Sequence, residues 1–202
     1  VSWRPQPITE RLAWRRVRHH APNVAWPPRG KGLRLEFAPP PGAGLEGLKV
    51  FVDYRLYDGL PLLSKQVHIE NGTDRPVEID RLTAEVLAVV EHSNWVETRG
   101  HVAQPIPQYL HVETDYAFGG FVVENAQRQV VHWRADPDYK TQVNYRRETP
   151  CLLEVEPLRG PDVIVQPGKA FAGFRVFELL HDTTERERRG LARKRMYRTI
   201  AP

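Results

Sequence analysis

The run from Leu48 to His92 constrains the fold of this chain more than any other stretch, because it predicts consecutive antiparallel strands joined by tight turns. Side chains of two kinds alternate along its first part, with the two-residue period of a strand that has two different faces. Asp58-Gly59 and Asn71-Gly72 predict the turns, since these residue types tolerate the positive φ of hairpin loops. Pro76 to Val90 predicts a third strand, and its length leads us to expect a bulge or bend near Thr83-Ala84.

Shorter runs of the same kind continue along the chain. They predict strands at 33–37, 109–114, 121–124, 129–134, 139–147, 151–156, 163–165 and 170–180, with a weaker strand near 12–18. The 18 prolines and 14 glycines suit an all-β protein with many turns. Asp182, with a glutamate three residues later, is close to a capping box and predicts one helix from about Thr183 to Arg198. We therefore expect an all-β fold, an antiparallel β-sandwich or supersandwich over residues 1–182, with one C-terminal helix in residues 183–202.

The net charge of +4 comes from the end of the chain. Seven basic and two acidic residues between Glu185 and Arg198 give this stretch a local charge of +5, so the remainder carries −1. A basic end is one sign of nucleic-acid binding, but a solvated helix face is the better interpretation because the body carries no matching basic stripe. We therefore expect no nucleic-acid partner.

Three further features of the sequence concern disulfide bonds, membrane-spanning segments and processing of the chain. Cys151 is the one cysteine, so no internal disulfide can form. The cysteine content therefore assigns the protein to no particular cellular compartment. No run of about 18 apolar residues occurs, so we expect no membrane partner and no membrane-spanning helix. The sequence starts at Val1 without a methionine or a signal-peptide core, which is typical of a fragment or a processed product.

Residues Gly42 to Gly47 read G-x-G-x-x-G, the pattern of a dinucleotide-binding loop. Such a loop must open a helix, so that the helix N-terminus meets the pyrophosphate. Here prolines precede the motif and a predicted strand follows it, so we expect a loop tip instead. The histidines lack metal-ligand spacing, and no HExxH, paired CxxC or P-loop motif occurs. We therefore predict no cofactor and no metal.

Candidate binding residues lie along two neighbouring predicted strands. Asp53, Arg55 and Tyr57 alternate on one side of the first strand, and His68 lies on one side of the second. Faces that mix rings with planar polar groups bind sugars, because rings stack on apolar C–H faces and polar groups pair with hydroxyls. An ordinary solvated sheet face is the alternative interpretation.

A glutamate and two loop tryptophans complete the candidates. Glu85 and Glu91 are six residues apart and would share one strand face, and a pair of carboxylates is what glycoside hydrolysis needs. Solvated or hydrogen-bonded structural glutamates are the alternative. Trp26 and Trp95 lie in predicted loops, where a ring can serve as an interface or a ligand platform. Trp133 lies within a predicted strand, so we expect it in the core.

Several short blocks together resemble one protein family. The blocks are Trp26–Leu33, Tyr54–Lys65, Glu70-Asn71, Asp80–Ala88, Glu113–Gly119 and Arg188–Pro202. In this order they resemble the β-rich region that precedes the catalytic barrel of α-galactosidase-like glycoside hydrolases. The resemblance implies a β-supersandwich, similar to the galactose-mutarotase-like fold, and a terminal helix that leads toward a barrel missing here. It carries over no catalytic residue, since the catalytic aspartates of such enzymes lie on barrel strands. A mutarotase-like site would use a histidine and a glutamate, for which His68 and Glu85 are the nearest candidates.

The first hypothesis is therefore a non-catalytic β-sandwich module of a glycoside hydrolase. Its expected partners are carbohydrate and the catalytic barrel of the same parent chain, and homo-oligomer formation stays open. Two alternatives remain. One is a free-standing carbohydrate-binding module, and the other is a mutarotase-like sugar-epimerising enzyme. The alternatives differ in structure, because the enzyme needs a histidine and a carboxylate within about 3–6 Å of each other across a concave pocket.

Overall fold

The structure, a computed structural model, describes residues 2–4, 28–92, 110–116, 130–136, 148–181 and 186–200. Eleven strands and one helix lie in these ranges. They are β1 (Ser2–Arg4), β2 (Gly30–Phe37), β3 (Leu48–Tyr57), β4 (Leu62–Asn71), β5 (Val77–Ile79), β6 (Glu85–His92), β7 (Leu110–Thr114), β8 (Val131–Ala135), β9 (Glu148–Val155), β10 (Val163–Val165), β11 (Ala170–Leu180) and α2 (Arg186–Ile200).

A six-stranded antiparallel sheet organises the molecule, in the order β1-β2-β3-β4-β11-β7. The predicted hairpin at its centre is confirmed, because β3 and β4 pair along their length and Gly59 turns between them with φ 74°. The alternation read from the sequence also holds. Asp53 lies directly opposite Gln66, whereas Val52 lies opposite Val67 on the other face.

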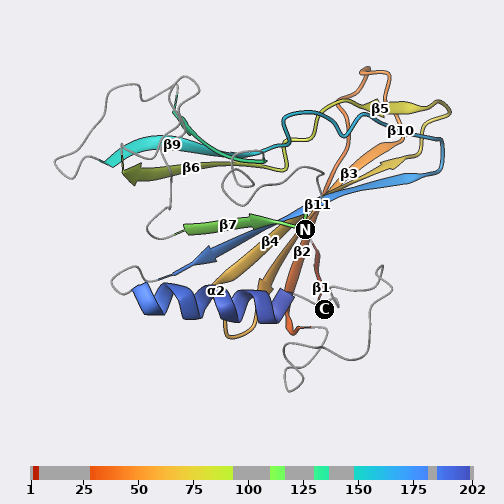
Figure 1. Ribbon diagram of the computed structural model, residues 1–202. Helices are drawn as coiled ribbons and strands as arrows, with labels where there is room; N and C mark the ends of the chain where they lie inside the picture. Colours follow the sequence, from red (N-terminus) through yellow and green to blue (C-terminus); the bar gives the residue numbers. More distant parts are fainter. Residues whose placement is uncertain are drawn as a thin grey trace.

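A three-stranded sheet, in the order β6-β9-β8, packs on one face of the six-stranded sheet (Figure 1). The core between the two sheets includes Val112 and Val176 of the larger sheet and Leu153 and Val155 of the smaller one. Trp133 is 4% exposed in this core, as predicted. The all-β sandwich expected from the sequence is therefore confirmed.

The predicted third strand is wrong in one respect. Pro76 to Val90 does not form one bent strand but two strands in different sheets, β5 pairing with β10 and β6 pairing with β9. The break lies at residues 80–84, close to the predicted bend, and the Ala84 N–H donates to the carbonyl of Val155 (2.8 Å) as the chain enters the second sheet. The apolar pattern alone could not show that the chain changes sheets here.

The predicted positive-φ turn at Asn71-Gly72 is also wrong, since neither residue has a positive φ. Asn71 instead ends β4 and is buried, and its Nδ2 donates to the carbonyls of Arg75 (2.8 Å) and Val165 (2.7 Å). A Cβ on Gly72 would lie 2.5 Å from the carbonyl oxygen of Gly47. The glycine is therefore required by a close approach of two backbone segments.

The helix α2 covers part of the opposite face of the six-stranded sheet, so that the molecule has three layers (Figure 1). Met196 of α2 is fully buried in a second core formed with Tyr57, Leu62, Phe177 and Leu179. The helix ends at Ile200, two residues beyond the predicted end. Among the described residues, no helix has the length and apolar character needed to cross a membrane.

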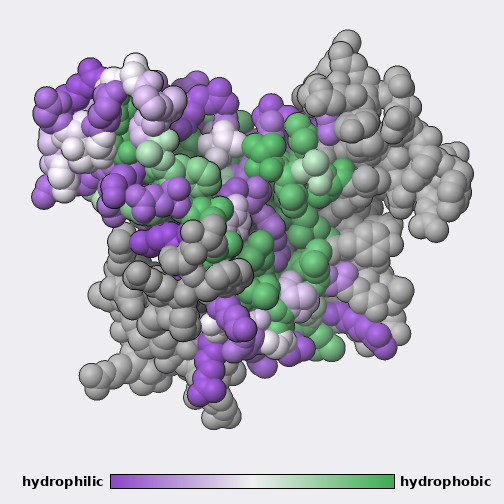
Figure 2. Space-filling model, turned by 180° about the vertical axis from the view of Figure 1, so that it is seen from behind, coloured by the Kyte–Doolittle hydropathy of each residue, from purple (hydrophilic) through white to green (hydrophobic). Residues whose placement is uncertain are grey.

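Seen from behind, apolar residues gather in the middle of the molecule and hydrophilic residues cover the lobe that holds β5 and β10 (Figure 2). Gly42, Gly44 and Gly47 all have positive φ, and β3 follows them. The glycine motif therefore opens a strand and offers no helix N-terminus to a phosphate. Predicted strands at 12–18, 121–124 and 139–147 lie outside the described residues.

Candidate functional site

Three neighbouring strands bring polar side chains into one row on the six-stranded sheet. Arg34 of β2 lies directly opposite Asp53 of β3, and Asp53 lies opposite Gln66 of β4. Directly paired residues project from the same face of a sheet, so the three side chains are neighbours. His68 follows two residues after Gln66 and shares this face.

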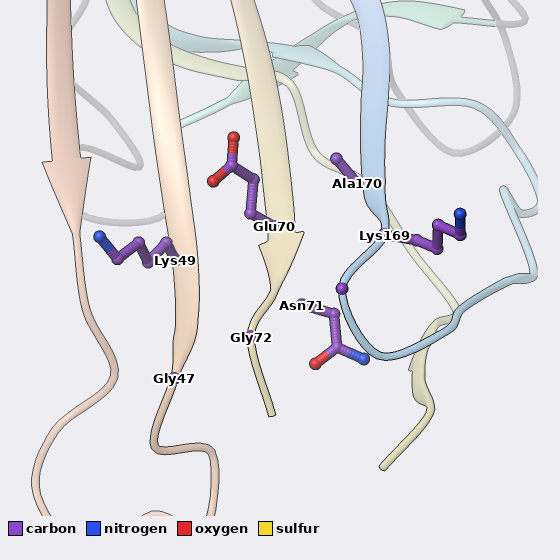
Figure 3. Close-up of a pocket in the computed structure, with 8 residues that line it drawn as sticks. Gly47, Lys49, Glu70, Asn71, Gly72, Lys169 and Ala170 are labelled. Carbon is purple, nitrogen blue, oxygen red and sulfur yellow. The ribbon is translucent and has the colours of Figure 1, made fainter. Parts of the chain in front are cut away.

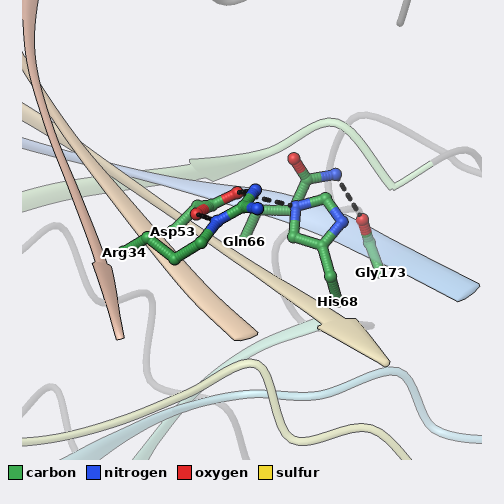
Figure 4. A network of polar contacts seen from close by, with 5 residues as sticks. All are labelled: Arg34, Asp53, Gln66, His68 and Gly173. Atoms are coloured by element: carbon green, nitrogen blue, oxygen red, sulfur yellow. Dashed lines mark hydrogen bonds and ion pairs between the residues drawn. The ribbon is translucent and has the colours of Figure 1, made fainter. Parts of the chain in front are cut away.

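Arg34, Asp53 and His68 are joined by polar contacts and Gln66 lies beside them, and we call the four side chains the Asp53 network (Figure 4). The Arg34 guanidinium donates Nε–H to Oδ1 of Asp53 (2.6 Å) and Nη2–H to Oδ2 (2.7 Å), a bidentate pair. Nε2 of His68 lies 3.2 Å from the same Oδ2. Gln66 donates Nε2–H to the carbonyl of Gly173 (2.8 Å), which lies at the register shift of β11.

The network keeps Asp53 charged. Burial alone would raise the pKa of this carboxyl, but hydrogen bonds from Arg34 and His68 outweigh burial and hold the pKa of Asp53 well below its usual range. The same pairing raises the pKa of Arg34. Asp53 is 9% exposed, so its carboxylate is sheltered from solvent. Near neutral pH Asp53 therefore presents a fixed acceptor and Arg34 a fixed donor.

His68 is the least satisfied member of the network. Its side chain is 10% exposed, with Nε2 toward Asp53. Its Nδ1 is buried and has no hydrogen-bond partner among the residues described. The sequence pointed to His68 and Asp53 as separate candidates on neighbouring strands, and the structure brings them into contact.

The other sequence candidates make none of the contacts of the Asp53 network that are described above. Arg55 shares the face of Asp53 and lies opposite Ser64. Tyr57 is 3% exposed beneath α2, where its hydroxyl meets Oγ of Ser64 (3.1 Å) and burial raises the pKa of the phenol. Glu85 lies on the opposite side of the sheet from His68, between the two sheets, where it binds Lys65 (2.9 Å). His68 and Glu85 are therefore not brought together.

Trp26 and Trp95 lie outside the described residues. Arg34 was missed from the sequence, although the signal was present. The predicted strand 33–37 precedes 48–57 by one loop, and an antiparallel register across that loop places Arg34 opposite Asp53. No group of three or more histidine, cysteine, aspartate or glutamate side chains suited to a metal ion occurs in the described part of the chain.

A pocket of about 340 Å³ lies at the end of the same sheet (Figure 3). Lys49 and Glu70 lie opposite each other on β3 and β4 and line it, and Glu70 lies two residues beyond His68. Gly47, Gly72 and Gly168 form other parts of its wall. Lys169 also lines the pocket, so side chains of both charges lie beside bare backbone, which suits a ligand that both donates and accepts hydrogen bonds.

No protein-family model and no curated protein matches the chain. Among solved structures, the chain is similar to a protein described as a candidate aldose 1-epimerase from Klebsiella pneumoniae subsp. pneumoniae MGH 78578, with 11% identity and a TM-score of 0.43. That match covers 86% of this chain and 56% of the other.

The chain is also similar to two variants of the GH36 α-galactosidase AgaA from Geobacillus stearothermophilus, one in complex with 1-deoxygalactonojirimycin and one with raffinose. Identities are 14% and 15%, the TM-score is 0.33 for each, and both matches cover 76% of this chain and 24% of the other. The chain thus spans about half of the epimerase and a quarter of the galactosidase. These are proteins of the kinds that the sequence resembles, and the likeness concerns the fold alone.

Proposed function

We propose that this chain is a non-catalytic β-sandwich module of an α-galactosidase-like glycoside hydrolase, which supports the catalytic domain and contributes contacts to carbohydrate. The Asp53 network is the observation that carries the proposal. It holds a guanidinium, a carboxylate and an amide in fixed positions on one sheet face. Planar groups that are held in place can pair with neighbouring hydroxyls without losing side-chain entropy on binding.

An aromatic ring beside the network supports the carbohydrate part of the proposal. The Arg34 guanidinium lies 5.2 Å from the centroid of the Phe51 ring, on the same sheet face as Asp53 and His68. A ring next to planar polar groups is the combination that binds the mixed apolar and hydroxyl surface of a sugar.

The ionisation of Asp53 and the position of Glu85 support the non-catalytic part of the proposal. A general acid or base works best when its pKa lies near the operating pH. The pKa of Asp53 is held far below that range by Arg34 and His68, so this histidine–carboxylate pair lacks an exchangeable proton on the carboxyl side. The other candidate pair, His68 and Glu85, is divided by the sheet.

Two measurements on the isolated chain test the proposal. Polarimetry with freshly dissolved galactose should show no acceleration of anomer exchange, and an acceleration would refute the non-catalytic role. Titration with galactose and with raffinose, followed by backbone NMR, should shift the amides near Arg34, Gln66 and His68. The Gln66→Ala variant should weaken these shifts, whereas Glu78→Ala, on a separate two-stranded sheet, should not. Absence of any sugar-dependent shift would remove the carbohydrate contact from the proposal.

A free-standing carbohydrate-binding module is the second candidate, favoured by the pocket that Lys49 and Glu70 help to line. It predicts that sugar-dependent shifts centre on these two residues and on Gly72. Binding by the chain alone in the micromolar range would favour it, because an accessory contact within a larger enzyme needs less affinity.

A further inference from the structure

Three ionisable side chains face the space between the two sheets, and we call them the inter-sheet cluster. Lys65 lies on β4 and Glu178 on β11 of the six-stranded sheet, and Glu85 begins β6 of the three-stranded sheet. Nζ of Lys65 lies 2.9 Å from Oε1 of Glu85, and these two side chains are 14% and 10% exposed. The cluster therefore joins the two layers of the sandwich through charged groups.

The surroundings of the cluster are apolar. Val176 lies opposite Lys65, Val112 lies opposite Glu178, and Val155 lies opposite Glu85. All three valines belong to the core between the sheets. Water is therefore a poor competitor for the charges, and any imbalance among them is costly.

Glu178 faces few other titratable groups. β4 contributes Lys65, β6 contributes Glu85, and β3 contributes Tyr54, whose ring centroid lies 5.7 Å from Nζ of Lys65. On β7, the histidine and glutamate at 111 and 113 lie on the other face, since Val112 is the residue opposite Glu178. The inward residues of β8 and β9 around this core are apolar, as far as the structure describes them.

The cluster holds one ammonium and two carboxyl groups, so full ionisation of these three groups would give them a net charge of −1. Glu85 has more hydrogen-bond donors beside it than Glu178, because its Oε1 accepts from Lys65 and from the backbone N–H of Val86 (3.0 Å). Oε1 of Glu178 is buried and has no hydrogen-bond partner within the described ranges. The extra proton therefore belongs on Glu178.

The titration of Glu178 agrees with this assignment. Burial, the negative charge of Glu85 and a hydrogen bond with the Glu85 carboxyl raise the pKa of Glu178 to about 7, although Lys65 acts in the opposite direction. A carboxyl that is neutral in weak acid can donate its proton to Glu85 and so close a hydrogen bond from one sheet to the other.

We propose that the single proton shared by Glu178 and Glu85 is a pH-sensitive latch between the two sheets, and that its loss above neutral pH favours local opening of β6, in which β6 leaves both the six-stranded sheet and its partner strand β9. The two carboxylates then face each other from opposite layers, and their repulsion acts directly across the interface. This latch is independent of the carbohydrate role proposed above, because it lies on the other side of the six-stranded sheet from the Asp53 network.

The sign of the effect follows from proton linkage. The folded protein holds the Glu178 proton up to about pH 7, whereas an opened chain releases it near the ordinary value of 4.5. The folded state therefore binds more protons between these limits, and closure weakens as the pH rises through them. From pH 6 to pH 8 the opening constant of β6 should increase roughly tenfold, as linkage predicts for these two pKa values.

Carbon-detected NMR of glutamate carboxyl groups in the full chain tests the proposal directly. The Glu178 signal, assigned by its loss in Glu178→Gln, should titrate with a midpoint near pH 7. Hydrogen exchange of the β6 amides, corrected for the intrinsic rate at each pH, should show the tenfold increase in the natural protein and none in Glu178→Gln. Glu154→Gln is the matched control, because Glu154 pairs with Arg134 on the outer face of the same sheet.

A Glu178 signal that titrates below pH 5 would overturn the proposal, and so would equal pH dependence in the natural protein and Glu178→Gln. An ionised Glu178 whose signal shifts on addition of sodium or potassium would also overturn it, because a bound cation would then supply the missing charge. If Glu178→Gln does not fold, the signal is assigned instead from through-bond correlations to the Glu178 backbone, and the midpoint in the natural protein decides alone.

Discussion

Arg34 of β2 and Asp53 of β3 lie directly opposite each other and are joined by two parallel hydrogen bonds of 2.6 Å and 2.7 Å. The Asp53 side chain is 11% exposed and that of Arg34 is 36% exposed. A bidentate pair of this kind is stronger than an exposed ion pair, because the carboxylate is sheltered and both of its oxygens accept a charged donor. The pair anchors the candidate site.

Removing the guanidinium should cost stability. Arg34→Met leaves the Asp53 carboxylate sheltered without its main partner, which should lower the free energy of unfolding by roughly 2–3 kcal/mol. Urea unfolding followed by tryptophan fluorescence measures this. Lys49→Met is the control, because Lys49 pairs with Glu36 where both side chains are more than half exposed, and it should change little. Equal losses in the two variants would show that the pair at Asp53 is no stronger than a surface pair.

The stability that the Arg34–Asp53 pair contributes should decrease in acid. The pKa of Asp53 is lowered in the folded state from an ordinary 3.8, so its contribution to stability is present above that value and is lost as the pH falls below it. Unfolding free energies measured from pH 5 to pH 2 should fall more steeply for the natural protein than for Asp53→Asn. Parallel curves would contradict this.

The docking of α2 should depend on one buried side chain. Met196→Ala removes a fully buried residue that packs against Phe177 and Leu179, and it should destabilise the protein by about 2–4 kcal/mol. Leu191→Ala on the same helix truncates a side chain that is 60% exposed and should change stability by less than about 0.5 kcal/mol. Thermal unfolding by circular dichroism compares the two variants, and a similar loss in both would argue against the packed helix.

Two glycines should respond in opposite directions to alanine. Gly72→Ala places a Cβ 2.5 Å from a carbonyl oxygen of Gly47, so the backbone must shift and stability should fall. Gly190→Ala meets nothing within 4 Å in the middle of α2 and should stabilise the protein by up to about 1 kcal/mol. Melting temperatures check both, and a stable Gly72→Ala variant would contradict the close approach of the two loops.

The phenol of Tyr197 should lose its proton at a higher pH than an ordinary tyrosine. Burial and the hydrogen bond that it donates to Oε1 of Glu113 (2.6 Å) raise the pKa of Tyr197 to about 12. Glu113→Gln should move this midpoint back toward 10, because the charge that opposes phenolate formation is removed. Ultraviolet titration of each protein, with its Tyr197→Phe counterpart subtracted, isolates the phenol. An unchanged midpoint in Glu113→Gln would exclude this contact in solution.

Strand β3 shows that alternation in the sequence predicts which residues share a face, but not which face is buried. The two-residue period correctly placed Asp53, Arg55 and Tyr57 on one side of the strand. It could not show that this side is the more buried one, since Leu56 on the other side is 53% exposed. Burial depends on which layer packs above each part of the sheet, and α2 comes from a distant part of the chain.

The long-range pairs were harder to predict than the strands. Glu85 was predicted inside one strand from Pro76 to Val90, whereas it begins β6, and its partner Lys65 comes from another sheet. Glu178 was not a candidate, because nothing in the run around it distinguishes a buried carboxyl from a solvated one. Contacts between layers join residues with no fixed spacing, so a periodic pattern carries no information about them.

The amino-acid sequence by itself determined most of the described strands, the tight turn at Gly59 and the helix near the end of the chain, because these follow from local periodicity and from residues that favour particular backbone angles. Only the tertiary structure decided that the chain changes sheets after β5, that Arg34 holds Asp53, and that Glu85 and Glu178 both face the space between the layers. The physical reason is that alternation specifies two faces for each strand, whereas the partner of each face depends on how the sheets and the helix stack.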